Sequence, residues 1–148
     1  MNLEENKKNA IDFYKMAYEG NPAKAVADYI GDDYIQHNPV VSDGTQGFID
    51  YFERMQLEYR NKLIEFVRCI AEGDLVAMHT HQTWPGNDEY VMMDFLRFDE
   101  GGKIVEHWDS IQQIPISYLL LSNIFKLSLT NTLALINCIL SVSLARLA

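Results

Sequence analysis

Three residues stand out because their types and spacing could support proton transfer. His79, Asp94 and His107 lie in three consecutive segments in which polar and apolar residues alternate. A carboxylate among apolar neighbours loses hydration, and this loss suits it to act as a general base near neutral pH. Neighbouring imidazoles can orient such a base, shuttle protons or donate to a developing enolate oxygen. We therefore take these three residues as candidate catalytic groups.

The segments that carry these residues have the period-two pattern of strands joined by short turns. The predicted strands span residues 62–72, 75–84, 89–99 and 103–113. A symmetric connection between the second and third strands places His79 opposite Asp94. The next turn, at residues 99–102, places Asp94 opposite His107. The three side chains are then expected side by side on one face.

Two more polar residues fall on the same predicted face. His81 and Asp109 lie one step along from the candidate triad, at about 5 Å between directly facing Cβ atoms. We take both as substrate-binding candidates. A slip of one residue in register would instead move His107 to the opposite face and bring Trp108 in, so Trp108 is a further candidate.

Simpler interpretations of these residues stay open. Asp94 could pair with Arg97 or a neighbouring histidine and only satisfy a polar position in the sheet. His79 and His81 share a face at the spacing of a metal pair, but no third ligand follows at a familiar spacing, so we predict no metal. The last candidate, His37, ends a short extended segment and is either a pocket residue or an ordinary loop residue.

The N-terminal part predicts helices. Residues 2–19 carry one apolar stripe, formed by Ala10, Phe13, Tyr14 and Ala17. A second helix is expected over residues 22–29, and a third begins after Ser42 or Asp43, either of which could cap it. Helices followed by a run of strands predict a segregated α+β fold with an antiparallel meander.

Composition and charge exclude several classes of protein. Of 148 residues, 48% are hydrophobic and 22% charged, which is typical of a folded domain. The net charge of −9 argues against nucleic-acid binding, because no basic stripe is present. Cys69 and Cys138 are too far apart to form a zinc motif and suit a reducing compartment. The charged N-terminus is unlike a secretory signal, so we expect a cytoplasmic protein.

The charge distribution divides the chain after residue 115. Residues 1–115 hold 10 basic and 21 acidic residues, a net charge of −11, and form the predicted domain. Residues 116–148 carry a net charge of +2, and residues 127–145 are uncharged. This extension is a segment unrelated to the domain, a membrane anchor or an apolar packed helix. Its many Ser, Thr and Asn residues make the anchor the less favoured alternative.

The predicted strands are apolar on the second face as well. Val91, Met93 and Phe95 alternate with Asp94 and so point away from it. Helices can cover one face of the sheet, and a second copy of the chain can cover the other. We therefore expect a homodimer.

Several motifs together resemble the SnoaL-like polyketide cyclase group of the nuclear transport factor 2-like superfamily. The most specific is the run from Gly102 to Asp109, GKIVEHWD. The others are Gln36-His37-Asn38-Pro39, Asp43-Gly44 with Phe48 and Phe52, residues 75–79, residues 94–97, Ile111-Gln112 and Ile114-Pro115. The resemblance spans nearly all of residues 1–115, whereas the apolar extension departs from it.

The resemblance implies a cone-shaped α+β barrel, commonly dimeric, in which helices and a curved sheet surround a pocket. It implies acid–base chemistry without a cofactor on a small apolar carbonyl compound, as in aldol cyclisation, isomerisation or dehydration (a lyase or isomerase). The matching pocket positions are His37, His79, Asp94, His107 and Asp109. A non-catalytic module that binds a small ligand or dimerises is the alternative, because such folds host both.

Overall fold

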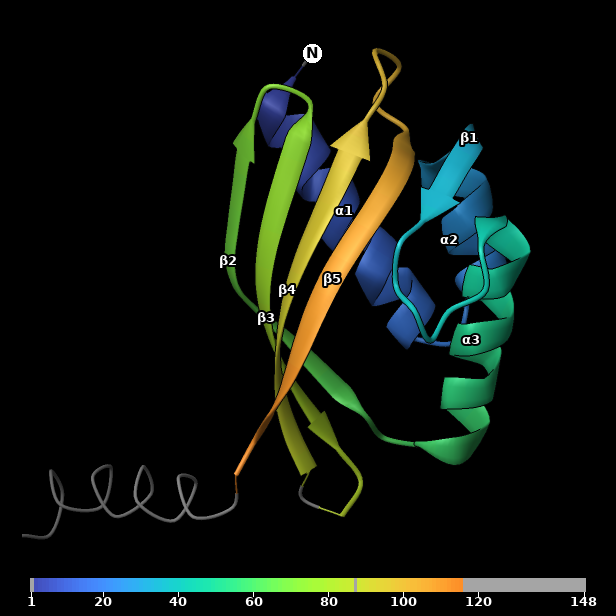
Figure 1. The fold of residues 1–148 in the computed structure, drawn as a ribbon, viewed down its shortest axis with the longest axis vertical. Coiled ribbons are helices and arrows are strands. Elements are labelled where there is room, and N and C mark those ends of the chain that lie inside the picture. Colours follow the sequence, from blue (N-terminus) through green and yellow to red (C-terminus); the bar gives the residue numbers. More distant parts are fainter. Residues whose placement is uncertain (1, 87, 116–148) are drawn as a thin grey trace, which may run out of the picture. The chain divides into compact units, whose positions relative to one another are not determined.

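The computed structural model describes residues 2–86 and 88–115, and it confirms the predicted α+β class (Figure 1). The elements follow in the order α1 (Leu3–Tyr18), α2 (Pro22–Tyr29), β1 (Ile30–Gln36), α3 (Gly44–Glu58), β2 (Leu63–Glu72), β3 (Leu75–Trp84), β4 (Asp88–Phe98) and β5 (Ile104–Ile114). No helix within these described ranges is long and apolar enough to cross a membrane. The three alternatives for residues 116–148 fall outside the described residues.

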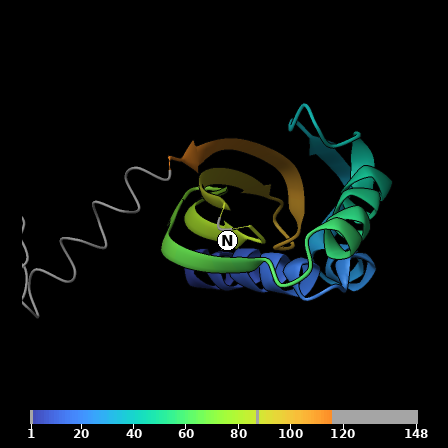
Figure 2. The same cartoon turned by 90° about the horizontal axis from the view of Figure 1, so that it is seen from below.

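The five strands form one curled sheet in the order β1-β5-β4-β3-β2. β2, β3 and β4 pair in antiparallel fashion, as predicted. β1 pairs with β5 in parallel, which the sequence did not predict because the two strands are about 70 residues apart. Since β1 and β2 are the two ends of the order, the sheet curls without closing, and the helices pack against it (Figure 2).

The core lies between the helices and the inner face of the sheet. The predicted stripe of α1, formed by Ala10, Phe13, Tyr14 and Ala17, is buried, as expected for an amphipathic helix. The ring of Phe13 stacks on Phe48 of α3 with 4.7 Å between centroids. This contact joins the two helices that carry the aromatic wall of the candidate site.

The loop between β1 and α3 is held close to both elements. The Asp43 carboxylate accepts hydrogen bonds from the backbone N–H groups of Gly44 and Gln36, at 2.8 and 2.9 Å. These bonds lower the pKa of Asp43 and make it, rather than Ser42, the cap of α3. A Cβ atom at Gly47 would overlap the Ser42 carbonyl, so glycine lets this loop lie against the helix.

Candidate active site

The register between β3 and β4 differs by one residue from the prediction. Asp94 pairs with Met78, and His79 pairs with Met93. The hairpin brings Trp84 opposite Asp88, so its connection is three residues long rather than four. Residues that pair directly share a face of the sheet. Shortening the connection by one residue therefore places Met78 on the face of Asp94 and His79 on the opposite face. The prediction that His79 and His81 share a face with Asp94 is therefore wrong.

Both of these histidines have partners on the outer face, away from the helices. His79 Nδ1 lies 3.0 Å from Arg68 Nη1. His81 Nε2 lies 2.7 Å from Glu89 Oε2. Because each ring is committed to a different neighbour, the two histidines do not converge on one point.

His37 and Trp108 also meet outside the core. Their rings stack in parallel with 4.9 Å between centroids. His37 Nε2 lies 2.8 Å from Glu106 Oε1, and the other oxygen of Glu106 accepts from Arg97 at 2.7 Å. These two candidates thus tie the start of the β1–α3 loop to the outer side of β5.

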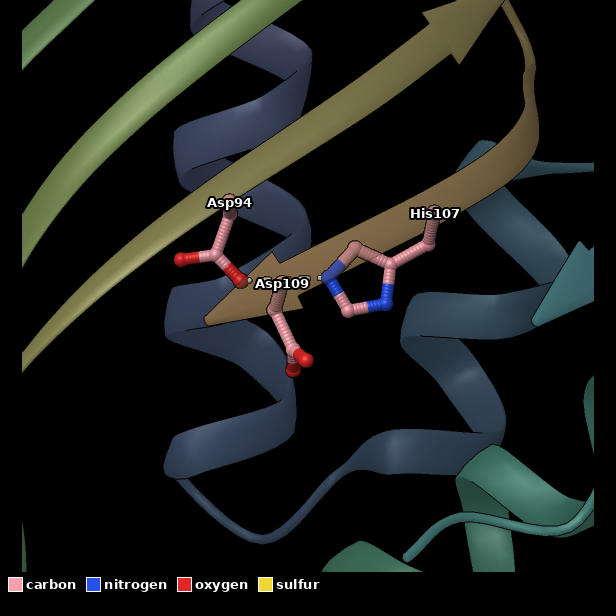
Figure 3. Close-up of side chains that lie close together, drawn as sticks. All are labelled: Asp94, His107 and Asp109. Atoms are coloured by element: carbon pink, nitrogen blue, oxygen red, sulfur yellow. Dashed lines mark hydrogen bonds and ion pairs between the residues drawn. The ribbon is translucent and has the colours of Figure 1, made fainter. Parts of the chain in front are cut away.

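The predicted meeting of Asp94 and His107 is confirmed. His107 Nε2 lies 3.1 Å from Asp94 Oδ1 (Figure 3). Both side chains are buried, at 4% and 0% exposure. Ile104 belongs to the core and His107 contacts Tyr14, so both point inward, although residues three apart in a regular strand point to opposite faces. A local irregularity in β5 therefore turns His107 inward and leaves Trp108 outside.

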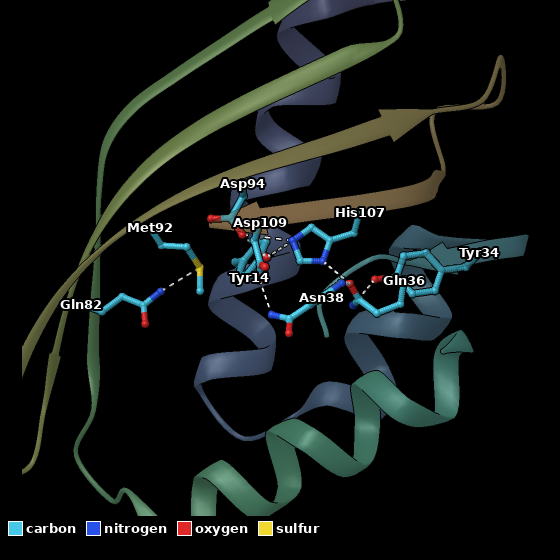
Figure 4. A network of polar contacts seen from close by, with 9 residues as sticks. All are labelled: Tyr14, Tyr34, Gln36, Asn38, Gln82, Met92, Asp94, His107 and Asp109. Atoms are coloured by element: carbon cyan, nitrogen blue, oxygen red, sulfur yellow. Dashed lines mark hydrogen bonds and ion pairs between the residues drawn. The ribbon is translucent and has the colours of Figure 1, made fainter. Parts of the chain in front are cut away.

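Tyr14 of α1 completes a triangle of short contacts with this pair (Figure 4). Its hydroxyl donates to Asp94 Oδ1 at 2.6 Å and lies 2.9 Å from His107 Nε2. Burial is the main cause that raises the pKa of Tyr14, followed by the charge of Asp94, so its hydroxyl keeps its proton. The second oxygen of Asp94, Oδ2, has no hydrogen-bond partner among the described residues.

Asp109 lies beside this triangle in a different environment. It follows His107 by two residues on β5 and is half-buried, and its Oδ2 accepts from Asn38 Nδ2 at 2.5 Å. Burial raises the pKa of Asp109, with a smaller contribution from the charge of Asp94, whereas His107 and Asn38 lower it. A carboxylate with a raised pKa is a better proton acceptor near neutral pH than an exposed one.

Three consecutive residues of β1 and the following loop position β5. Gln36 Oε1 lies 2.9 Å from His107 Nδ1, His37 contacts Glu106, and Asn38 contacts Asp109. These contacts follow from the parallel pairing, in which Gln36 lies opposite His107. The inner and outer faces of β5 are therefore both anchored by one short stretch of chain.

A cavity of about 20 Å³, room for about one water molecule, lies next to these groups. Its lining combines phenylalanine and tyrosine rings with amide, imidazole and carboxylate groups, and it consists of Tyr14, Tyr18, Gln36, Asn38, Val41, Phe48, Tyr51, Phe52, Gln82, Met92, His107 and Asp109. Of the seven predicted site residues, His107 and Asp109 line this cavity. Asp94 does not line it, but its Oδ1 contacts Tyr14 and His107, which do.

Sequence reasoning missed Tyr14, Gln36 and Asn38. Tyr14 was predicted only as a core residue of the α1 stripe, although a buried tyrosine hydroxyl needs a polar partner. Gln36 and Asn38 flank His37 in a motif that was noticed for its resemblance alone. Their contacts depend on the unpredicted pairing of β1 with β5.

The same groups have the chemistry of a metal site. Asp94, His107 and Asp109 each offer one ligand atom, and these atoms lie within 4.8 Å of one another. Two carboxylates and one imidazole could hold a divalent ion. In the described arrangement the ligand atoms of Asp94 and His107 instead contact each other and Tyr14.

Residues 10–107 match the SnoaL-like domain family. The structure is similar to TsrD from Streptomyces laurentii, with a TM-score of 0.66 and 16% identity, over 76% of this chain and 91% of that one. It is also similar to a proposed polyketide cyclase from Bacillus cereus, with a TM-score of 0.65 and 21% identity, over 73% and 74% of the two chains. A third similar structure is a proposed ketosteroid isomerase from Kribbella flavida, with a TM-score of 0.63 and 16% identity, over 76% of this chain and 82% of that one. Curated proteins give no match.

Proposed function

The chain belongs to the SnoaL-like family, and on this premise we propose that it is an acid–base enzyme acting on a small carbonyl compound. The reaction is an aldol cyclisation, an isomerisation or a dehydration. Each begins when a base removes a proton from the carbon next to the carbonyl group. The observation that supports the proposal is that Asp109, whose pKa is raised by burial, lines one cavity with the Tyr14 hydroxyl and the His107 imidazole.

In this proposal Asp109 is the general base. One of its oxygens is held by Asn38, and the carboxylate lines the cavity. Asp94, the base expected from the sequence, is fully enclosed, and its Oδ1 is already contacted by Tyr14 and His107. We therefore assign Asp94 to holding the proton donors in place instead of removing the substrate proton.

Tyr14 and His107 are the proposed donors to the developing enolate oxygen. Hydrogen-bond donors in a water-poor site stabilise such an oxyanion without having to reorganise during the reaction. A buried tyrosine beside a buried carboxyl group is a known pattern of this kind. Removal of the proton by Asp109 and stabilisation of the enolate by this pair make up the proposed mechanism.

The cavity limits the substrate. A volume of about 20 Å³ holds one small group, so the reacting carbonyl would displace whatever fills it and the rest of the substrate would move side chains aside. Met92 is a lining side chain that can move, because methionine is unbranched and adaptable. We therefore propose a small substrate of largely apolar character.

The test is exchange of α-protons with D₂O in a panel of small ketones and β-keto esters, followed by proton NMR. The wild-type protein is expected to accelerate exchange in at least one compound. Asp109→Asn should lower that acceleration by about 10²–10⁴-fold. Glu106→Gln, which changes a carboxylate on the outer face of the same strand, should leave it within twofold. Equal exchange by wild type and Asp109→Asn would contradict the proposal.

A second candidate function, dimerisation, is supported by the outer face of the sheet. An apolar hollow of about 390 Å³ lies there, lined by Arg68, Ile70, Ala77, Met78, His79, Met93, Asp94 and Phe95. Met93 and Phe95 are 45% and 47% exposed. We propose that a second copy of the chain covers this hollow, as the exposed apolar side chains would otherwise face water.

Acidic charge does not oppose a second copy at this place. Residues 1–115 carry a net charge of −11, so two copies repel one another over most of their surface. Two charged residues line the hollow, but Asp94 is 0% exposed and its Oδ1 contacts Tyr14 and His107 on the inner face, which leaves Arg68 as the exposed charge. The exposed lining of this hollow therefore adds no acidic side chain to that repulsion.

Light scattering of the full chain tests the dimer. The wild type is expected at twice the chain mass, and Phe95→Glu at the mass of one chain. Val40→Glu changes an exposed residue of the β1–α3 loop and should remain dimeric. A wild-type mass of one chain would contradict the proposal.

A further inference from the structure

We infer that Gln36 is a positioning residue that keeps a proton on Nδ1 of His107 and leaves Nε2 to share a proton with Tyr14 and Asp94. The inference deepens the proposed function, because it says how the buried cluster comes to hold a proton beside the cavity. It can fail or hold independently, since its test measures the protonation of a ring nitrogen and needs no substrate.

The orientation of the Gln36 amide group is fixed by the backbone. Its Oε1 lies 3.0 Å from the backbone nitrogen of Asn38, and a backbone N–H can only donate. The atom that faces it must therefore be the carbonyl oxygen. On the other side, the Gln36 amide nitrogen donates to the Tyr34 hydroxyl at 2.9 Å. The two contacts together exclude the flipped amide.

The fixed amide decides which tautomer of His107 is stable. The same Oε1 lies 2.9 Å from His107 Nδ1, so Nδ1 must carry a proton to make this contact a hydrogen bond. Gln36 and His107 are only 8% and 4% exposed. With Nδ1 deprotonated, two lone pairs would face each other where water cannot replace the lost bond, which is costly.

The remaining nitrogen then faces two oxygens. Nε2 lies 2.9 Å from the Tyr14 hydroxyl oxygen and 3.1 Å from Asp94 Oδ1, and these two oxygens are 2.6 Å apart. Tyr14 contributes one proton, which can fill one of the three contacts. A second proton, held on Nε2 or on Asp94 Oδ1, fills another and removes the clash of lone pairs.

The second proton can move between its two positions through Tyr14. When it is on Nε2, it is donated to the Tyr14 oxygen while Tyr14 donates to Asp94. When it is on Asp94 Oδ1, that carboxyl donates to Tyr14 and Tyr14 donates to Nε2. Both arrangements use the same short contacts, so Tyr14 donates within the cluster in either one, and it donates to a substrate oxygen in the cavity when that oxygen replaces Asp94 Oδ1 or Nε2 as its acceptor. Gln36 makes this possible because it occupies the other ring nitrogen.

The experiment is ¹⁵N NMR of the full chain labelled at histidine, with the His107 signals assigned by their loss in His107→Gln. In the wild type at neutral pH, Nδ1 of His107 is expected to show the chemical shift and one-bond coupling of a protonated nitrogen. Gln36→Leu removes the acceptor and should shift protonation from Nδ1 towards Nε2. Gln36→Glu keeps an acceptor at the same place and should restore the wild-type pattern at Nδ1.

A matched control distinguishes loss of the hydrogen-bond acceptor in Gln36→Leu from a general change in packing around Gln36. Tyr34→Phe removes the other side-chain partner of Gln36, while the Asn38 N–H still holds the amide, so Nδ1 should stay protonated. An unprotonated Nδ1 in the wild type, or an unchanged Nδ1 in Gln36→Leu, would overturn the inference. So would the same change in Gln36→Leu and Tyr34→Phe. If Gln36→Leu does not fold, the wild-type and Gln36→Glu spectra decide: a protonated Nδ1 in both supports the inference, and an unprotonated Nδ1 in either overturns it. If Nδ1 is protonated as expected but the protein accelerates no α-proton exchange, the proposed function is rejected and the inference about Gln36 stands.

Discussion

Strand β5 carries two carboxylates, three residues apart, whose pKa values are shifted in opposite directions. Contacts with His37 and Arg97 on the outer face lower the pKa of Glu106. Burial on the inner face raises the pKa of Asp109. The side chains differ by one methylene, so the face of the sheet, rather than the residue type, sets their chemistry. Of these two, the inner carboxylate is therefore the better proton acceptor.

The histidines show the same contrast between faces. His107 is enclosed by Tyr14, Asp94 and Gln36. His81 meets Glu89 where both side chains are about a quarter to a third exposed, at 31% and 24%. Partly exposed ion pairs contribute little free energy, because water screens them. A cluster shielded from water is therefore the place where substitutions should have large effects.

The largest effect is expected from neighbouring residues of β4 that point to opposite faces. Leu96 is fully buried on the inner face, so Leu96→Ala should lower the free energy of unfolding by about 2–5 kcal/mol. Phe95→Ala on the outer face should cost less than about 1 kcal/mol at concentrations where the chain is monomeric. Urea denaturation at low protein concentration measures both. Equal losses would mean that the two faces are equally packed in the single chain.

A second comparison concerns activity. Tyr14→Phe removes a proposed donor to the enolate and should lower the rate of α-proton exchange by about 10²-fold or more. His79→Gln changes an outer histidine and should alter that rate by less than twofold. The measurement is exchange in D₂O by proton NMR. A large loss in His79→Gln would restore the role that the sequence predicted for this residue.

A smaller effect concerns stability and pH. The pKa of Asp109 is raised in the folded chain, so its charged form opposes folding above that pKa. Asp109→Asn should therefore be more stable than the wild type at pH 7. The difference should shrink as the pH falls through the folded pKa and vanish below the ordinary value of 3.8, where both states are protonated. Thermal denaturation from pH 3 to 7 checks this; a variant less stable than wild type at pH 7 contradicts it.

The smallest effect is expected at a contact between a histidine and a glutamate on the outer face. His81→Gln removes the contact with Glu89, and the free energy of unfolding should change by less than about 0.5 kcal/mol. Urea denaturation at pH 7 measures it. A loss above about 2 kcal/mol would show that the outer face holds a polar network as important as the inner one.

Local patterns predicted the elements well. The stripe of α1 was right because a period of 3.6 residues identifies a buried helix face directly. Four strands followed from a period of two and from glycine-containing turns. These signals depend on neighbouring residues only, so they survive folding with small changes at the ends of the elements.

Register and long-range pairing were harder to predict. One residue less in the β3–β4 connection was enough to move His79 and His81 to the outer face. Asp94 and His107 still meet, because the irregularity in β5 brings His107 to the inner face. Gln36 was missed because its contact with His107 requires the parallel pairing of β1 and β5, which no local pattern indicates.

Burial on the inner face is what makes Asp109 a better proton acceptor than a carboxylate on the outer face. Carbon-13 NMR titration of the side-chain carboxyl groups tests it most directly, since Asp109 and Glu106 can be followed in one sample. Asp109 is expected to titrate above 3.8 and Glu106 below 4.5. A value for Asp109 at or below 3.8 would contradict it, because a carboxylate held charged by its surroundings is a poor base.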